Sequence, residues 1–250
     1  MRIEDLDAGR VVPGCSAQML RTLEAFGLTW DGPVEYQSAR IGHYAQALDA
    51  LGARGLTFEC SCSRSERLTG RGYPGTCRSG PHRGGPTATR LRVPDLSICF
   101  EDRAQGSCSF ELARLGDVII RRRDGTYAYQ LAVVVDDALQ GVTDVVRGAD
   151  LLDNTPWQIA LQQALGLPTP RYAHLPVVLE PRRGKLAKSR GAIAIDPRSA
   201  GSQLHQVLTL LRQDPPATLK LESGATVLEW ARRHWNLDRL QAVKEVTLTV

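Results

Sequence analysis

The 250-residue sequence has no apolar run of the length that a membrane-spanning helix requires. Its longest uninterrupted apolar run extends from Leu131 to Val135, whereas a bilayer needs about 20 such residues. The chain opens on the acidic segment Met1–Asp7 and has no apolar core there, so this start is not a secretory signal peptide. We therefore expect no membrane association.

Lysine is also scarce, because only four of the 31 basic residues are lysines. The net charge of +4 is unevenly distributed, with basic character concentrated in residues 54–92 and 171–198. A partner with a phosphate backbone would favour this pattern, although surface arginine is more often simply solvated. The remaining composition, 42% hydrophobic and 23% charged, excludes a disordered or fibrous chain.

The six cysteines are not expected to form a disulfide framework, since no secretory signal is present. Cys60, Cys62 and Cys77 lie within eighteen residues, in a segment rich in glycine, proline and arginine. Three thiolates at this spacing provide three corners of a zinc tetrahedron, with His82 or Tyr73 as candidates for the fourth ligand. The alternative is a group of reduced, partly buried cysteines without a metal.

Hydrophobic periodicity and turn signals predict an α/β body, interrupted by a β-rich segment and followed by a helical tail. Alternation of helices with buried strands predicts a mostly parallel sheet. An Asp-Gly pair predicts a tight turn at 123–126. The predicted helices are 13–26, 38–54, 130–139, 153–166, 199–213 and 224–235, and the predicted strands are 56–60, 90–93, 109–112, 118–120, 142–146 and 172–179.

Two further features point to charged ligands. The segment Lys185–Ser189 is flanked by Gly184 and Gly191, and such a loop can either clamp a polyphosphate or remain a solvated basic loop. Arg147 ends an apolar strand, where a guanidinium needs an anionic partner. That partner is either a ligand or an internal carboxylate, Asp136 or Asp137.

Four segments in this order, Arg2–Asp7, Tyr129–Asp137, Gly141–Gly148 and Lys185–Ser189, resemble the catalytic core of class I glutamyl-tRNA synthetases. The cysteine cluster with Tyr73–Cys77, and a chain that ends soon after the lysine loop, narrow the resemblance to the glutamyl-Q tRNA(Asp) synthetase branch, which lacks an anticodon-binding domain. The resemblance extends from residue 1 to about residue 195. An ordinary glutamyl-tRNA synthetase fragment is disfavoured, because no anticodon-binding domain follows Val250.

The resemblance implies a class I Rossmann-type parallel sheet with a β-rich, zinc-containing insertion and a helical C-terminal tail. The resemblance also implies a division of the chain into four segments. Residues 1–55 and 129–180 are expected to form the two parts of the Rossmann domain. Residues 56–128 are expected to form the zinc-containing insertion, and residues 181–250 the KMSKS-like loop and the tail.

The resemblance also implies roles for individual residues. Glu4 matches the contact to the amino group of glutamate, and Tyr129 and Arg147 match the pair that recognises the substrate. Lys185 and Lys188 match the ATP-binding lysines, with Lys188 as the catalytic one. The implied zinc ligands are Cys60, Cys62, Tyr73 and Cys77.

The implied reaction is adenylation of glutamate by ATP with Mg²⁺, followed by transfer of glutamate to queuosine in the anticodon of tRNA(Asp). We expect a cytoplasmic monomer. None of the five histidines lies in an HIGH-like tetrad, which class I synthetases carry after their first strand. The family's first strand and helix, about fifty residues, would precede Met1. We therefore expect impaired activity. The alternative is a catalytically inactive remnant that binds RNA or zinc.

Overall fold

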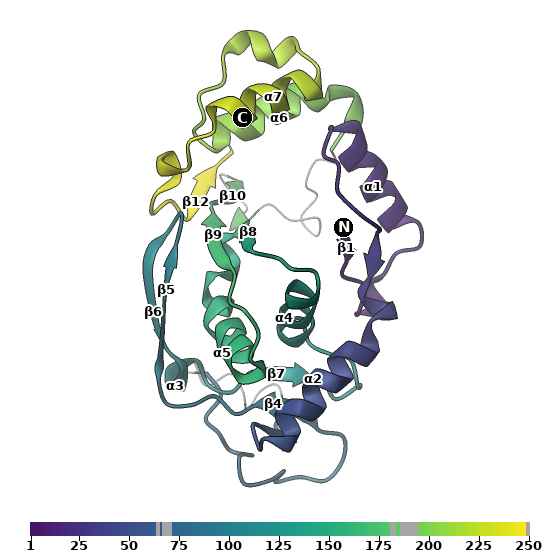
Figure 1. The fold of residues 1–250 in the computed structure, drawn as a ribbon, viewed down its shortest axis with the longest axis vertical. Coiled ribbons are helices and arrows are strands. Elements are labelled where there is room, and N and C mark those ends of the chain that lie inside the picture. Colours follow the sequence, from purple (N-terminus) through teal and green to yellow (C-terminus); the bar gives the residue numbers. More distant parts are fainter. Residues whose placement is uncertain (64–65, 67–71, 181–183, 186–194, 249–250) are drawn as a thin grey trace.

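The computed structural model describes residues 1–63, 66, 72–180, 184–185 and 195–248. Helices α4 (Tyr129–Leu139) and α5 (Thr155–Leu165) pack against each other in the middle of the molecule (Figure 1). Helix α2 (Ile41–Ala53) packs on both of them, and α1 (Cys15–Ala25) lies at the outer edge on the same side. The hairpin of β5 (Ser97–Asp102) and β6 (Gly106–Glu111) borders the opposite side.

Helix α4 forms the centre of the main hydrophobic core. Its residues from Gln130 to Asp136 are all buried, because the helix is apolar on nearly every side and must be surrounded by other elements. Leu131 and Val134 pack with Tyr44 and Leu51 of α2 and with Leu161 of α5 in one cluster. The predicted buried helix at 130–139 is confirmed.

The largest sheet contains four strands in the order β6 (Gly106–Glu111), β5 (Ser97–Asp102), β9 (Arg171–Leu175) and β8 (Asp144–Gly148). Strands β8 and β9 are parallel, and their register places Arg147 opposite His174. Strand β5 joins β9 in parallel at Asp102 and pairs with β6 as an antiparallel hairpin. This sheet therefore brings the ends of β5, β8 and β9 together.

Three smaller sheets complete the described strands. The antiparallel sheet of β3 (Thr57–Cys60), β4 (Ala88–Leu91) and β7 (Ile119–Arg121) supports the cysteine region. Strands β1 (Arg2–Ile3) and β2 (Glu35–Tyr36) form a parallel pair. The third sheet pairs β10 (Val177–Glu180) antiparallel with β11 (Gly184–Lys185) and parallel with β12 (Glu245–Thr247).

The structure confirms most of the predicted elements and corrects three. The single strand expected at 172–179 is divided into β9 and β10 at Pro176, which has no N–H to donate to a sheet. Strand β5 was not predicted, although its burial alternates, with Ile98 and Asp102 buried and Cys99 and Glu101 exposed. The C-terminal segment contains β12 besides helices α6 (Ala200–Leu210) and α7 (Gly224–His234).

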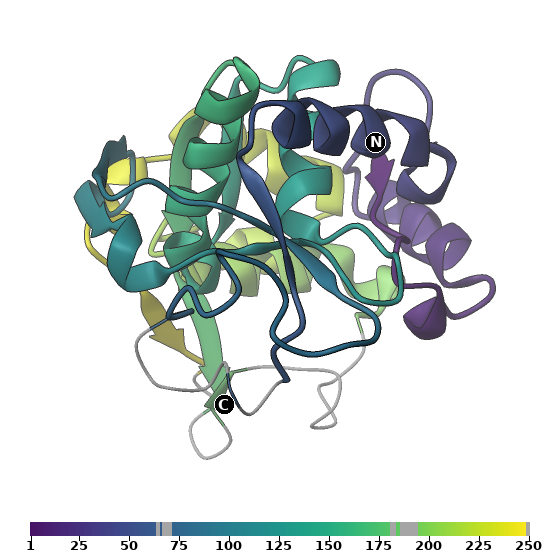
Figure 2. The same cartoon turned by 90° about the horizontal axis from the view of Figure 1, so that it is seen from below.

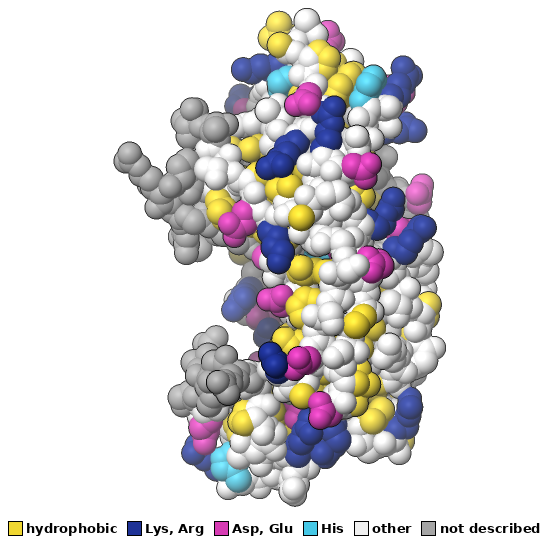
Figure 3. Space-filling view, turned by 90° about the vertical axis from the view of Figure 1, so that its left-hand side faces the viewer, with side chains coloured by type: hydrophobic (Ala, Val, Ile, Leu, Met, Phe, Trp, Pro, Cys, Tyr) yellow, Lys and Arg dark blue, Asp and Glu magenta, His cyan; other side chains and the backbone are white. Residues whose placement is uncertain are grey.

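The expected parallel strands are present, but within the described residues they are divided among separate sheets and mixed with antiparallel pairs. Figure 2 views the molecule from below, where the antiparallel sheet of β3, β4 and β7 lies next to α2 and α4. On the face shown in Figure 3, described Lys and Arg side chains alternate with Asp and Glu. No helix in the described part of the chain is both long and apolar enough to span a bilayer.

Gly116 permits a close approach between two backbone segments, because a Cβ there would lie 2.4 Å from the Tyr73 backbone nitrogen. Its φ of +73° already strains any other residue. Gly141 has a similar φ of +67°, but nothing lies within 4 Å of its Cβ position. Gly116 therefore carries an additional packing constraint next to the cysteine region.

Replacing these two glycines by alanine should show how much more constrained Gly116 is. We expect Gly141→Ala to lower the free energy of unfolding by about 1–2 kcal/mol, the cost of a left-handed conformation. We expect Gly116→Ala to lower it by about 1–3 kcal/mol more, because its φ of 73° and ψ of 177° suit glycine alone and because the Tyr73 backbone must move. Urea unfolding of both variants checks this expectation, and equal losses would contradict it.

Candidate functional site

Tyr129 and Arg147, which the sequence places eighteen positions apart, meet in the structure. Tyr129 is the first residue of α4, and Arg147 lies near the carboxyl end of β8. Arg147 Nη1 donates a hydrogen bond to the Tyr129 hydroxyl at 3.2 Å. Both residues are half-buried, so the pair remains accessible from one side.

The other partners of Arg147 are neutral. Its Nε donates to Nε2 of His174 at 3.0 Å, and its Nη2 donates to Oγ1 of Thr155 at 2.9 Å and to the Leu151 carbonyl at 3.5 Å. Within the described residues, Arg147 makes no ion pair with a carboxylate. Among the described residues, the guanidinium is thus held in place by hydrogen bonds to neutral groups.

The internal carboxylates considered for Arg147 bind other residues. Asp136, which is fully buried, accepts hydrogen bonds from Gln37 Nε2 at 2.8 Å, Arg40 Nε at 2.7 Å and the Tyr44 hydroxyl at 2.7 Å. These contacts tie α4 to α2 and to the turn before it. The alternative of a salt bridge from Arg147 to Asp136 is therefore wrong.

Asp137 pairs instead with Arg2, whose Nη1 lies 2.7 Å from Oδ1 of Asp137. Burial raises the pKa of Asp137, and the charges of Arg2 and Arg147 oppose that shift. Glu4 contacts the same Arg2 at 3.2 Å and has a side chain 41% exposed. Glu4 is therefore connected to α4 through Arg2, and the contacts of its carboxylate do not include Tyr129 or Arg147.

The structure describes one of the two lysines of the predicted ATP-binding loop. Lys188 lies outside the described residues. Lys185 belongs to β11, where its backbone is opposite Leu179 of β10.

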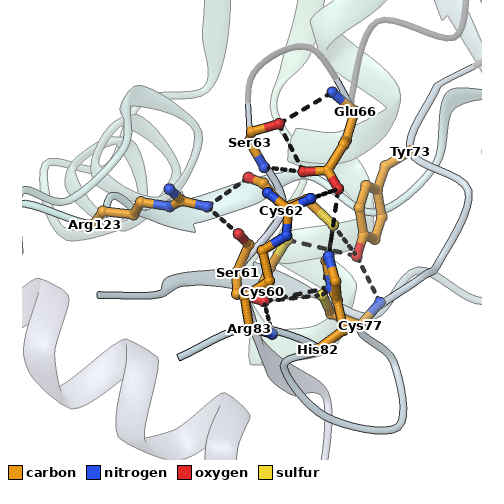
Figure 4. Close-up of polar contacts among 10 residues, drawn as sticks. All are labelled: Cys60, Ser61, Cys62, Ser63, Glu66, Tyr73, Cys77, His82, Arg83 and Arg123. Atoms are coloured by element: carbon orange, nitrogen blue, oxygen red, sulfur yellow. Dashed lines mark hydrogen bonds and ion pairs between the residues drawn. The ribbon is translucent and has the colours of Figure 1, made fainter. Parts of the chain in front are cut away.

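Cys60, Cys62 and Cys77 come together with Tyr73 in a buried cluster (Figure 4). Their three Sγ atoms lie within 4.8 Å of one another, and Cys62 and Cys77 are 3.5 Å apart. Tetrahedral zinc with bonds of about 2.3 Å separates two sulfur ligands by about 3.8 Å. The three thiols therefore fit a zinc site without a large rearrangement.

Both candidates for a fourth ligand lie against these sulfurs. The Tyr73 hydroxyl is 3.5 Å from Cys60 Sγ and 3.6 Å from Cys62 Sγ, and it accepts a hydrogen bond from the Cys77 backbone N–H at 2.8 Å. His82 Nδ1 is 3.2 Å from Cys77 Sγ, and its Nε2 contacts Glu66. The geometry thus leaves a place for either residue.

The local environment shifts the pKa values of the side chains in this cluster in different directions. Burial raises the pKa of the Cys62 thiol to about 11. Although burial opposes the change, hydrogen bonds with Tyr73 and His82 lower the pKa of the Cys77 thiol to about 5. Burial also raises the pKa of Tyr73, as do its hydrogen bonds with Cys60 and Cys77. Cys77 is therefore the thiol most readily available as a thiolate.

A cavity of about 690 Å³ adjoins this cluster and extends to Ala128, the residue before Tyr129. Arg90 is 4% exposed, its guanidinium lies 3.8 Å from the centre of the Tyr73 ring, and its Nε has no partner in the described structure. Arg123 donates to the carbonyl oxygens of Ser61 and Cys62. The basic residues that line the cavity are Arg10, Arg90, Arg122 and Arg123, beside one acidic residue, Asp124.

Sequence reasoning missed the residues behind Arg147. His174 is fully buried on β9, and Asp102 ends the unpredicted strand β5. The sequence signal for His174 was a histidine inside an otherwise apolar strand, Tyr172–Leu175. Asp102 and Thr155 gave no separate signal, because their role depends on which strands and helices become neighbours.

The sequence of this chain is similar to those of known proteins over most of its length. The family model described as tRNA synthetases class I (E and Q), catalytic domain, matches residues 1–203. A curated relative from Ectopseudomonas mendocina, named glutamyl-Q tRNA(Asp) synthetase, is 48% identical over 242 residues, which cover 96% of this chain and 82% of the relative. The chain belongs to the glutamyl-Q tRNA(Asp) synthetase family.

Other members of this family are equally similar. The relative from Pseudomonas aeruginosa is 48% identical over 242 residues, covering 96% of this chain and 83% of its own. The relative from Thiobacillus denitrificans is 47% identical over 249 residues, covering 96% and 83%. The predicted family, a branch of the class I synthetases, is confirmed.

Solved structures confirm the fold. The crystal structure of a glutamate tRNA ligase from Elizabethkingia meningosepticum, in complex with its amino acid, superimposes with a TM-score of 0.77 at 22% identity. It covers 99% of this chain, which spans 60% of the length of that ligase. A glutamate-tRNA synthetase from Elizabethkingia anophelis gives the same TM-score of 0.77 at 21% identity, covering 100% of this chain and 61% of that one. The predicted class I synthetase catalytic fold is therefore present.

Proposed function

We propose that this chain activates glutamate with ATP and transfers it to queuosine in the anticodon of tRNA(Asp). The relatives named glutamyl-Q tRNA(Asp) synthetase support this assignment. The observation that carries it is the Arg147 guanidinium, held beside the Tyr129 hydroxyl by neutral partners. A cation fixed at a strand end, with no carboxylate partner in the described part of the chain, suits an anionic substrate.

In this proposal Arg147 and Tyr129 bind the side-chain carboxylate of glutamate, and Glu4 binds its amino group. Glu4 is already oriented by its ion pair with Arg2, which Asp137 of α4 holds in turn. Although burial opposes it, the two carboxylates Asp137 and Glu4 raise the pKa of Arg2, so this support stays charged. The substrate site would thus form between β1, β8 and the start of α4.

The proposed reaction consists of two transfers. The glutamate α-carboxylate attacks the α-phosphorus of ATP, pyrophosphate leaves, and the glutamyl group then passes to a hydroxyl of queuosine. Mg²⁺, bound with ATP, supplies charge that offsets the phosphates. Lys188 is proposed as the catalytic cation that stabilises the leaving pyrophosphate, with Lys185 also binding ATP. Positioning of the reactants and electrostatic stabilisation supply most of the acceleration.

We further propose that the basic segments 54–92 and 171–198 contact tRNA. The cavity beside the cysteine cluster supports this for the first segment, because Arg90 of that segment lines it together with Arg10, Arg122 and Arg123 from elsewhere in the chain. The cavity also reaches Ala128, next to the proposed glutamate site. Arg10 and Arg122 share the single carboxylate of Asp7, and Arg123 makes no ion pair within the described residues, so positive charge at the cavity remains available to phosphate.

We also propose that Cys60, Cys62, Tyr73 and Cys77 bind one zinc ion within the segment 56–128. The three sulfurs and the Tyr73 hydroxyl already lie together in a buried cluster. A closed set of four protein ligands is a structural site, so the ion would fix the loop between Cys62 and Cys77.

Substitution of Arg147 tests the proposed function directly. Arg147→Ala should weaken L-glutamate binding about 30-fold or more, because about 2 kcal/mol of charge-assisted hydrogen bonding is lost. ATP binding should stay within about twofold, which isothermal titration calorimetry measures for both ligands. Arg171→Ala on β9 is the matched control, since Arg171 is exposed and pairs with Asp144. Equal weakening of both ligands would contradict the role of Arg147.

Zinc content and ligand identity can be measured together. Freshly purified protein should contain about one zinc ion per chain, and Cys62→Ser should remove it, as a closed site requires all its ligands. Tyr73→Phe should weaken zinc binding, whereas His82→Ala should leave it unchanged. Elemental analysis and chelator competition provide the readout. A metal-free protein with three freely reacting thiols would argue decisively against the site.

RNA contact at the arginine-lined cavity predicts a change in salt dependence. Arg122→Ala should weaken binding of tRNA(Asp) and reduce the slope of log K against log salt concentration by about 1, because one phosphate contact is lost. Arg232→Ala, on α7 and paired with Glu229, is the control. Filter binding from 50 to 200 mM salt measures the slopes, and an unchanged slope for Arg122→Ala would place the RNA elsewhere.

A further inference from the structure

A buried pair, Asp102 and His174, lies directly behind Arg147. His174 faces Arg147 across the parallel β8–β9 pair, and its ring is fully buried. Its Nδ1 lies 2.5 Å from Oδ2 of Asp102, and its Nε2 lies 3.0 Å from Nε of Arg147. The three side chains thus form a line from the end of β5 to the proposed glutamate site.

The hydrogen-bonding groups fix where the proton on the imidazole resides. Oδ1 of Asp102 accepts from the backbone N–H groups of Ala104, Gln105 and His174, so the carboxylate is held as an acceptor. An acceptor at Oδ2 requires the proton on Nδ1 of His174. Nε2 then carries a lone pair, which is what the N–H at Arg147 Nε needs.

The charge states agree with this assignment. Burial lowers the pKa of His174, and the hydrogen bond with Asp102 does not overcome this effect. Although burial opposes it, hydrogen bonds from His174 and from backbone N–H groups lower the pKa of Asp102. At neutral pH the pair is therefore an aspartate and a neutral imidazole.

A neutral acceptor differs from a carboxylate in its effect on Arg147. A carboxylate at this place would orient the guanidinium but also neutralise it, whereas the imidazole orients it and leaves its charge available to a ligand. Thr155 accepts from Nη2 of Arg147 and lies 3.2 Å from Nε2 of His174, so it braces both groups.

We propose that His174 is a positioning residue, which together with Asp102 fixes the guanidinium of Arg147 and so sets the preference for a side-chain carboxylate over an amide. His174 accepts from Nε of Arg147, Thr155 and the Leu151 carbonyl accept from Nη2, and Tyr129 accepts from one Nη1 N–H. Two donors therefore have no partner within the described structure, namely the second Nη1 N–H and the hydroxyl proton of Tyr129. Two fixed donors suit a carboxylate with two acceptor oxygens, while the NH₂ of glutamine would place a donor against one of them.

This inference rests on the proposed binding of glutamate by Arg147, so the variants are chosen to separate the two. His174→Gln can place an amide oxygen near the position of Nε2 and keep an acceptor for Arg147. His174→Asn can keep a donor near the position of Nδ1 for Asp102 but offers nothing to Arg147. The pair therefore differs in the contact that the proposal requires.

Asp102→Asn provides a second variant that leaves His174 in place. The amide oxygen of Asn would stay with the three backbone N–H groups that Oδ1 now accepts. Its NH₂ would then face Nδ1 and move the imidazole proton to Nε2, where an N–H would oppose the N–H of Arg147. The side chain changes by one atom, so packing is preserved.

The experiment measures equilibrium binding of L-glutamate, L-glutamine and ATP to the full chain by isothermal titration calorimetry. We expect His174→Asn and Asp102→Asn to weaken glutamate binding about tenfold or more, to bring the glutamate and glutamine affinities within about threefold of each other, and to leave ATP binding within about twofold. His174→Gln should stay within about threefold of the wild type for all three ligands.

Nitrogen-15 NMR of the wild-type imidazole provides a readout that does not depend on binding or on the folding of a variant. The His174 resonances should report the Nδ1–H tautomer at pH 7, and an Nε2–H tautomer or an imidazolium would overturn the inference. Equal glutamate affinities of His174→Asn, His174→Gln and the wild type would also overturn it, while leaving Arg147 as the substrate contact. Failure of the wild type to bind glutamate would overturn the proposed function and this inference together.

Discussion

The burial of helix α4 is the constraint on which the rest of the structure depends. A helix that is apolar on nearly all sides is stable in water only when other elements enclose it, and here α2 and α5 pack against it. The same burial makes the polar residues of α4 costly unless they are paired. Asp136 satisfies that requirement through Gln37, Arg40 and Tyr44, which orients α2.

The position of α4 also places the start of the helix at the site. Tyr129 is its first residue, so its hydroxyl is held at the carboxyl end of β8 beside Arg147. Asp137, one residue after the buried Asp136, holds Arg2 and through it Glu4. One buried helix therefore positions Tyr129 and Glu4, two of the residues that we propose bind glutamate.

The arginines show how the fold distributes charge. Arg78 is paired with Asp117 through two short hydrogen bonds, and Arg40 is paired with Asp136 and Glu35. Arg147 instead has a neutral imidazole, two hydroxyls and a carbonyl as partners. Because an isolated buried cation is unfavourable, a guanidinium with neutral partners marks the place where the structure suits an incoming anion.

The sequence by itself determined the local elements and the residue types of the site. Helical periodicity predicted α2, continuous apolarity predicted α4, and capping residues predicted α5, while α6 and α7 were expected as the clearest segments of the helical tail. Motif order indicated the family, and the spacing of Cys60, Cys62 and Cys77 predicted a cluster that the structure brings together. Tyr129 and Arg147 were predicted to act together, and the structure places them in contact.

Only the tertiary structure decided which partners these residues have. The choice between Asp136, Asp137 and an external anion for Arg147 depended on Arg2, Arg40 and Gln37, which are about a hundred or more positions from those carboxylates in the chain. Asp102 and His174, separated by 72 positions, meet because β5 pairs with β9. Contacts of this kind carry no periodicity in the sequence, because strand pairing and not local propensity brings the two side chains together.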